Sequence, residues 1–224
     1  MSKTHKIEIA PSIASGPLVN LQETILELER AGASMLHFDI EDGSFVPEMN
    51  IGIKVIGELR PLSNLPFDVH LMVNNPEWLI PELALMGADQ VSVHYEACPY
   101  PRRILRLIVD AGMRAGLAFN PKTPIPDLEY CLPYLSFVVV LTTEPEHEDC
   151  PFLPDVLRKI TDGKRQPELD GVSWVADGDI SAENVSRAVA AGADRLVIGR
   201  GIFRDGRMSE NMAEIQREIA GLSG

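Results

Sequence analysis

The chain has 224 residues, of which 45% are hydrophobic and 24% are charged, and its formal net charge at pH 7 is −13. This composition excludes a mostly disordered chain, because there is ample apolar surface to bury. The acidic balance argues against nucleic acid or anionic lipid as a main partner, since it repels both. No apolar run approaches the ~18 residues that a membrane span requires, so we expect no membrane partner.

The three cysteines of the chain, Cys98, Cys131 and Cys150, stand far apart. Their number and spacing favour neither a disulfide framework nor a CxxC metal site. The first residues lead into a short strand and not into a secretory hydrophobic segment. We therefore expect a cytoplasmic protein.

Strand-like runs and amphipathic helical patterns alternate along the chain. The strand-like runs occupy residues 6–11, 35–40, 66–71, 90–95, 115–119, 136–141, 171–176 and 195–199. The helical patterns occupy residues 22–31, 53–59, 76–86, 101–111, 126–132, 154–160, 182–191 and 210–220. Glycines such as Gly32, Gly87 and Gly192 follow a helical pattern and precede a strand, as expected of helix caps. The polar segment 161–170 is predicted to be a surface loop.

Eight β/α units in a chain of this length predict a single (β/α)8 barrel, the TIM-barrel fold, with residues 1–224 as one domain. An open, doubly wound sheet is the alternative. It would favour a Gly-rich GxGxxG turn after an early strand, and the chain has none. In a closed barrel the carboxyl ends of all strands meet at one face, so the polar residues at those ends belong together.

Four polar side chains stand at the ends of three predicted strands. His37 and Asp39 are two residues apart and share one face of the second strand, His70 ends the third strand, and Asp177 ends the seventh. Each residue alone has a structural interpretation, as a hydrogen-bonded core histidine or a turn aspartate. Only a closed barrel brings all four together, and two imidazoles with two carboxylates favour a divalent metal site. His94 of the fourth strand is expected to support it.

Six stretches carry a resemblance to one family: residues 9–12, 37–47, 68–72, 93–97, 117–124 and 176–178. On these motifs the sequence resembles the ribulose-phosphate 3-epimerase family over nearly its whole length. The resemblance implies the (β/α)8 barrel and an isomerase that inverts the carbon next to the ketone of a ketose phosphate. The default reaction that it implies converts D-ribulose 5-phosphate to D-xylulose 5-phosphate.

The same resemblance implies site residues. His37, Asp39, His70 and Asp177 are the implied ligands of one divalent metal ion (zinc, iron, manganese or cobalt), and Asp39 and Asp177 are the implied catalytic carboxylates. Removing a proton beside a ketone leaves an enediolate, which a divalent cation stabilises as a Lewis acid. Two carboxylates on opposite sides then serve as base and acid. The resemblance also implies a small sugar or sugar phosphate as partner and a homo-oligomer, either a dimer or a hexamer.

The segments that would bind a phosphate depart from the family pattern. The segment 142–151 lacks the family's glycines and contains four acids: Glu144, Glu146, Glu148 and Asp149. Asp179 stands where the family has a glycine, and Arg200 lies in a Gly-Arg-Gly step after the eighth strand. Either Arg200 clamps a phosphate with Asp179 turned away, or the two pair and the substrate tail is a hydroxyl or another polar group.

Further residues are predicted to line the substrate site. Glu41 is two residues from Asp39 and is therefore expected to point to the same face of the strand as His37 and Asp39. It stands where the family has a methionine, whereas Ser12 and Met72 retain the family residues. The predicted substrate-binding residues are therefore Ser12, Glu41, Met72, Gly178, Asp179, Gly199 and Arg200.

Three other functions fit the same residues. The first is epimerisation of a different ketose, with or without a phosphate. The second is aldol cleavage or decarboxylation through the same enediolate. The third is metal binding or sugar binding without catalysis. An epimerase would exchange the proton next to the ketone with solvent, an aldolase would release a smaller aldehyde, and a binding protein would do neither.

Overall fold

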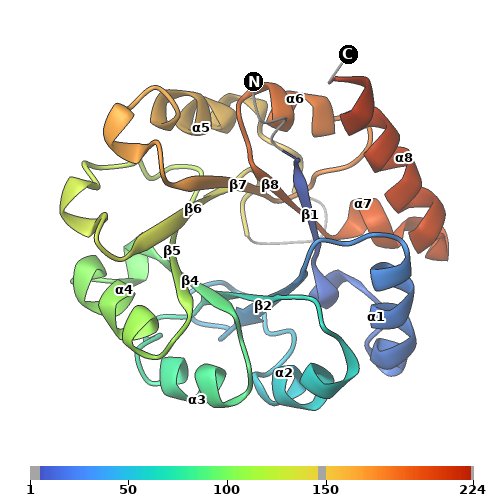
Figure 1. Ribbon diagram of the computed structural model, residues 1–224, viewed down its shortest axis with the longest axis horizontal. Helices are drawn as coiled ribbons and strands as arrows, with labels where there is room; N and C mark the ends of the chain where they lie inside the picture. The colour runs from blue at the N-terminus through green and yellow to red at the C-terminus, as the bar shows by residue number, and fades with distance from the viewer. Residues whose placement is uncertain (1–5, 146–149, 223–224) are drawn as a thin grey trace.

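Eight parallel strands form a nearly closed barrel in the computed structural model, which describes residues 6–145 and 150–222. The helices lie around the outside of the strands (Figure 1). The strands are β1 (Glu8–Pro11), β2 (Leu36–Glu41), β3 (Phe67–Met72), β4 (Gln90–His94), β5 (Arg114–Phe119), β6 (Leu135–Leu141), β7 (Ser173–Asp177) and β8 (Arg195–Ile198). Each lies within a few residues of a predicted strand, so the predicted (β/α)8 barrel is confirmed.

The helices fill the gaps between strands. They are α1 (Leu21–Arg30), α2 (Lys54–Leu59), α3 (Leu79–Leu85), α4 (Pro101–Asp110), α5 (Arg158–Gly163), α6 (Val185–Ala190), α7 (Arg200–Phe203) and α8 (Met208–Gly221). Helix α4 shows why the pattern predicts them. Pro101 stands in its first turn, Ile104 and Ile108 share its buried face, and Gly112 follows its end with φ +89°.

The strand order is β1-β8-β7-β6-β5-β4-β3-β2, with neighbouring strands parallel. A single bridge between Ser12 and His37 links the ends of this order, so β2 lies beside β1 as well as β3. In the pairing of β2 with β3, Asp39 stands beside His70 and His37 stands beside Asp68. The register alone thus brings charged and polar side chains of neighbouring strands to the same level of the barrel.

The helix predicted at residues 126–132 is wrong. Only a 3-10 turn, Glu129–Cys131, forms there. Pro124 and Pro126 explain the difference, because proline lacks an N–H donor and disfavours helical backbone at the residue before it.

The loop predicted at residues 161–170 is also wrong in part. Helix α5 continues to Gly163, and Pro167–Leu169 forms a 3-10 turn. Helix α7 was not expected, because its four residues are too few to show a helical period.

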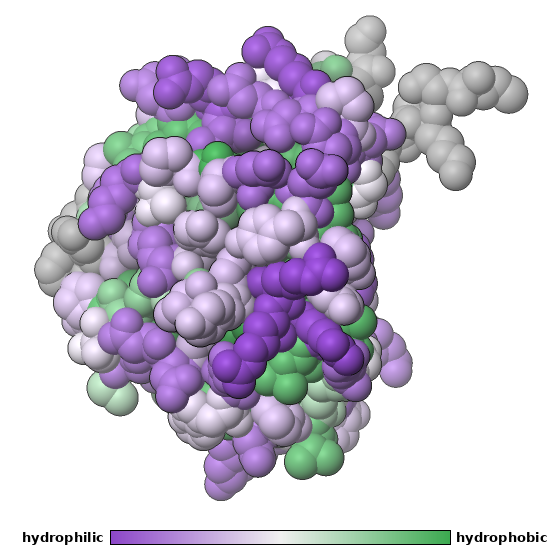
Figure 2. All heavy atoms as spheres, turned by 90° about the vertical axis from the view of Figure 1, so that its left-hand side faces the viewer, coloured by the Kyte–Doolittle hydropathy of each residue, from purple (hydrophilic) through white to green (hydrophobic). Residues whose placement is uncertain are grey.

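The apolar core has two parts, because side chains alternate between the two faces of a strand. The larger part fills the space between strands and helices and includes Phe38, Phe67 and Trp174. The smaller part fills the inside of the barrel with Ala10, Met35, Ala118, Phe137, Val139, Leu141, Val175 and Val197. A side view shows mostly polar side chains, with apolar groups in small separate patches (Figure 2). Among the described residues, no helix is both long enough and apolar enough to cross a membrane.

Gly163 generates a prediction about this packing. A Cβ added there would overlap the indole ring of the fully buried Trp174. Alanine favours a helix over glycine by up to ~1 kcal/mol, but overpacking costs ~1–3 kcal/mol. We expect Gly163→Ala to lower the free energy of unfolding by about 1–2 kcal/mol in urea denaturation. Gly171→Ala is the control, since its Cβ would meet nothing within 4 Å. Equal losses in the two variants would contradict the packing argument.

Candidate functional site

The four side chains predicted as metal ligands converge at the carboxyl-terminal mouth of the barrel. His37 and Asp39 come from β2, His70 from β3 and Asp177 from β7. One ligand atom from each, a ring nitrogen or a carboxylate oxygen, lies within 4.8 Å of all the others. The chain could therefore hold one metal ion here. The convergence needs the closed barrel, because β7 is not a neighbour of β2 or β3 in the strand order.

The distances within this cluster suit a small cation. His70 Nδ1 lies 3.3 Å from Asp39 Oδ1 and 3.3 Å from Asp177 Oδ2. His37 Nε2 lies 3.1 Å from Asp39 Oδ1 and 3.8 Å from Asp177 Oδ2. Nitrogen and oxygen ligands ~2.0–2.2 Å from a tetrahedral ion stand ~3.3–3.6 Å apart. The spacing of the donor atoms therefore fits a divalent ion without rearrangement of the strands.

A buried carboxylate holds the His37 ring. His37 Nδ1 donates to Asp68 Oδ2 at 2.9 Å, so Nε2 faces the cluster. Burial raises the pKa of Asp68, but His37 and Arg195 lower it further, and the net shift is below the usual value. Asp68 is thus an acceptor that fixes the orientation of the ring, as is common behind metal-bound histidines. No role for Asp68 was predicted from the sequence, although its two-residue spacing from His70 indicates an inward side chain.

Two successive contacts, from His70 to His94 and from His94 to Glu96, hold the His70 ring. Its Nε2 lies 2.9 Å from His94 Nε2, and His94 Nδ1 donates to Glu96 Oε2 at 3.2 Å. Burial lowers the pKa of His94 to about 4, so this imidazole is neutral. Burial opposes ionisation of Glu96, but the hydrogen bond from His94 lowers its pKa to about 2. The neutral His94 therefore accepts from His70 Nε2, and His70 Nδ1 points at the cluster. His94 was predicted to support the metal-binding residues, and its contact with His70 agrees with that prediction. No role was predicted for Glu96.

The protonation of the cluster also fits a cation. His70 Nδ1 is buried and makes no hydrogen bond within the described structure, although two carboxylate oxygens lie near it. Burial opposes a charge on this ring, yet Asp177 and Asp39 raise the pKa of His70 to about 9. The pKa of His37 is likewise raised, against burial, by Asp39 and Asp68. The carboxylates therefore attract positive charge to the point that a metal ion would occupy.

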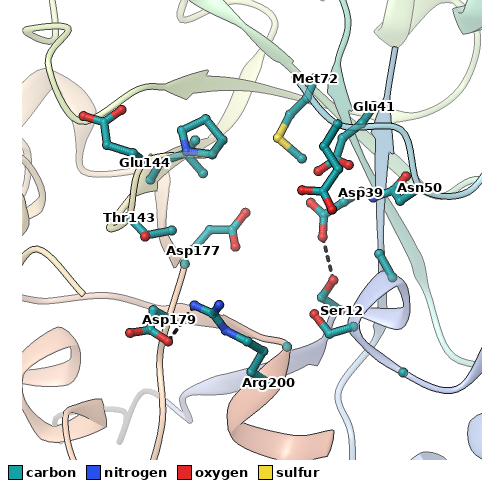
Figure 3. A pocket seen from close by; sticks show the side chains of 18 of the residues that line it. Ser12, Asp39, Glu41, Asn50, Met72, Thr143, Glu144, Asp177, Asp179 and Arg200 are labelled. Carbon is teal, nitrogen blue, oxygen red and sulfur yellow. Dashed lines mark hydrogen bonds and ion pairs between the residues drawn. The ribbon is translucent and has the colours of Figure 1, made fainter. Parts of the chain in front are cut away.

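A cavity of about 470 Å³ opens above Asp39 and Asp177. Figure 3 shows the two carboxylates on opposite sides of this cavity, with Met72 and Glu41 beside Asp39. Ser12 Oγ donates to Asp39 Oδ2 at 2.5 Å. Burial, and then the neighbouring charge of Asp39, raise the pKa of Glu41 to about 7. Ser12, Glu41 and Met72 therefore line this cavity, and their contact with a substrate stays a prediction.

The other predicted substrate-binding residues line the far end of the same cavity: Gly178, Asp179, Gly199 and Arg200. Arg200 Nη2 lies 2.9 Å from Asp179 Oδ1 (Figure 3), so Asp179 is not turned away and the two side chains pair, whereas the chemistry of the substrate tail stays a prediction. The other carboxylate oxygen of Asp179 accepts from the backbone N–H of Phe152 at 3.0 Å. Asp179 adopts φ +49°, a conformation that favours glycine, so these contacts hold a strained backbone.

The acidic segment contributes Glu144 to the cavity wall. Glu146, Glu148 and Asp149 of the same segment lie outside the described residues. Four polar lining residues were not predicted from the sequence: Ser15, Glu48, Asn50 and Thr143. Glu48, Asn50 and Thr143 stand in loops and Ser15 ends a 3-10 turn (Ile13–Ser15), where no periodic pattern indicates which side chains point inward.

Comparisons with known proteins show the family to which the chain belongs. The model of the ribulose-phosphate 3 epimerase family matches residues 8–203. The ribulose-phosphate 3-epimerase of Bacillus subtilis is 36% identical over 213 residues, which cover 94% of this chain and 98% of that protein. The enzyme of the same name from Escherichia coli K12 is 34% identical over 218 residues, which cover 96% of this chain and 97% of that protein.

Solved structures share the fold at much lower identity. Phosphoribosyl anthranilate isomerase from Thermus thermophilus superimposes with a TM-score of 0.70 and 14% identity, covering 96% of this chain and 100% of that one. A chain of the tryptophan synthase complex from Pyrococcus furiosus gives 0.66 and 14%, covering 94% of this chain and 98% of that one. Such likeness indicates the barrel alone. The family match and the full-length relatives decide the identity: this chain belongs to the ribulose-phosphate 3-epimerase family and is an isomerase of the carbohydrate-epimerase type.

Proposed function

We propose that the protein inverts the carbon next to the ketone of a ketose, and that its default reaction converts D-ribulose 5-phosphate to D-xylulose 5-phosphate. The observation that carries this proposal is the pair of carboxylates, Asp39 and Asp177, on opposite sides of the cavity beside His37 and His70. The names of the relatives supply the substrate. A cavity of about 470 Å³ has the size of a small-molecule site.

Inversion needs a base on one face of the carbon and an acid on the other. Asp39 comes from β2 and Asp177 from β7, so each carboxylate can reach a different face of a molecule bound between them. In one direction Asp39 takes the proton and Asp177 returns one to the opposite face; the reverse reaction exchanges these roles. The hydrogen bond from Ser12 favours the charged form of Asp39. The two carboxylates are expected to titrate as a coupled pair.

We assign one divalent ion (zinc, iron, manganese or cobalt) to the four clustered residues. When bound, it would polarise the ketone oxygen and stabilise the negative charge that develops as the carbon loses its proton. Imidazole and carboxylate ligands do not select strongly among these ions. The relays behind His37 and His70 keep one ring nitrogen of each directed at the site. The cytoplasmic location and the dimeric or hexameric assembly stay predictions of the sequence.

The pairing of Asp179 with Arg200 favours a second candidate, an epimerase of a ketose with an uncharged tail. Within the described lining, Arg200 is the single basic residue among six acids: Asp39, Glu41, Glu48, Glu144, Asp177 and Asp179. Its guanidinium already pairs with Asp179 at 2.9 Å and donates to the carbonyl of Cys150 at 3.2 Å. A phosphate dianion would have to share Arg200 with a carboxylate, whereas a hydroxyl would not.

The acid–base assignment makes a prediction. We expect Asp39→Asn and Asp177→Asn each to reduce epimerisation by about 10³-fold, because each removes the proton carrier on one face. Solvent deuterium incorporation, followed by NMR from each epimer separately, distinguishes the two faces. Any residual exchange should occur from one epimer in Asp39→Asn and from the other in Asp177→Asn. Asp110→Asn, an exposed acid on α4, is the control. Full activity in either test variant would reject the pair, and release of an aldehyde would indicate aldol cleavage.

The assignment of a divalent ion to the cluster makes a second prediction. We expect dialysis against a chelator to abolish activity and added Zn²⁺, Mn²⁺, Co²⁺ or Fe²⁺ to restore it, because the carbon acid is too weak without a Lewis acid. Elemental analysis should find one ion per chain in the loaded protein and less than a tenth of that in His70→Ala. Undiminished activity in the chelated, metal-free protein would contradict the assignment.

A ketose panel separates the two candidates. If the tail is a phosphate, wild type should prefer D-ribulose 5-phosphate, and Arg200→Ala should lower kcat/KM for it about 100-fold while leaving D-ribulose unchanged. If the tail is uncharged, wild type should prefer the free ketose, and Asp179→Gly should shift the preference towards the phosphate by releasing Arg200. Arg204→Ala is the matched control, because Arg204 lies outside this cavity. Activity on no ketose of the panel would reject both.

A further inference from the structure

A buried arginine lies inside the barrel below the metal-binding cluster. Arg195 is the first residue of β8, and only 1% of its surface is exposed. Its Nε donates to Glu8 Oε2 on the neighbouring β1 at 2.9 Å. Its other end reaches across the barrel to strands that are not neighbours of β8, where Nη2 lies 3.5 Å from Gln90 Oε1 on β4. A guanidinium placed here loses its contact with water, so its position demands compensating contacts.

The contact that matters is with Asp68. Arg195 Nη1 lies 3.6 Å from Asp68 Oδ2, and both side chains are 1% exposed. The same oxygen accepts the hydrogen bond from His37 Nδ1 at 2.9 Å. One carboxylate oxygen therefore stands between an arginine and a metal-ligating histidine, and the three groups form a column that ends at the cluster.

This column has a directional consequence for His37. With Nδ1 held by Asp68, Nε2 is the ring nitrogen that faces Asp39 Oδ1 at 3.1 Å. Asp68 Oδ1 makes no hydrogen bond within the described structure. Within the described structure the carboxylate therefore makes its contacts through Oδ2, to the His37 imidazole and to the Arg195 guanidinium. Arg195 adds a second contact to the same oxygen, so removing it would leave the orientation of the carboxylate to the His37 hydrogen bond and the strand register.

We propose that Arg195 is a positioning residue for the metal ligand His37, and that it acts through Asp68. The inference rests on the metal centre proposed above. Arg195 touches neither the cavity nor the cluster, so its effect on metal affinity must be transmitted by the carboxylate. A residue that only fills the barrel would contribute to stability and would leave metal affinity alone.

The test is a cobalt titration of metal-free protein, in which Co²⁺ absorption reports both affinity and ligand geometry. Arg195→Met keeps the length of the side chain and removes its charge, and we expect it to weaken Co²⁺ binding 10–100-fold with an altered spectrum. Arg195→Lys, which keeps the charge, should recover part of the loss. Arg114→Met on β5 is the matched control, because this arginine is exposed and contacts no residue of the column. It should bind Co²⁺ as wild type does.

A double-mutant cycle tests whether Arg195 acts on His37 through Asp68. In an Asp68→Asn background, Arg195→Met should change the Co²⁺ Kd less than twofold, because its intermediary is already lost. Full additivity of the two losses, or an unchanged Kd in Arg195→Met alone, would overturn the inference. If Arg195→Met fails to fold, Arg195→Gln takes its place with the same expected loss, since an amide N–H near the position of Nε can still donate to Glu8. Failure of wild type to bind Co²⁺ would instead overturn the metal centre itself.

Discussion

The structure depends on one constraint: two carboxylates and two imidazoles are removed from water at the mouth of the barrel, and their charges must be balanced there. Asp39 and Asp177 stand 3.3 Å from the same nitrogen of His70. Carboxylates this close destabilise each other unless a cation or a proton lies between them. The arrangement is therefore costly as a structural element and favourable as a binding site for a divalent ion. This is the physical reason to interpret the cluster as functional.

Side chains inside the barrel hold the two histidines of the cluster in place. His37 and His70 are each held from behind, one by Asp68 and the other by His94 with Glu96. Bulky branched apolar side chains dominate the interior of a typical barrel of this fold. Here the inner apolar cluster shares the space with a polar layer, so that ring orientation at the mouth is controlled by residues that no substrate would touch.

The two ends of the cavity differ in how closely their residues match the family pattern. Apart from Glu41, the end near Asp39 has the residues that the family pattern implies, and the proposed chemistry follows from them. The end near Arg200 has an ion pair, held in part by a strained Asp179 backbone, where relatives that act on phosphorylated sugars would need an unpaired cation or free N–H groups. The type of reaction depends on residues at the strand ends, whereas the choice of substrate tail depends on residues in loops. The two properties can therefore vary independently.

The sequence alone determined the barrel, its strands and the four residues of the cluster. These follow from local rules, because side chains two apart on a strand share a face and repeated β/α units close into one cylinder. The helix predicted at 126–132 failed where prolines outweighed an apolar pattern. Only the tertiary structure decided that Asp68 stands between His37 and Arg195, that Glu96 supports His94, and that Asp179 faces Arg200. Those contacts join strands and loops far apart in the chain, and their distances depend on register and loop conformation, which no local pattern encodes.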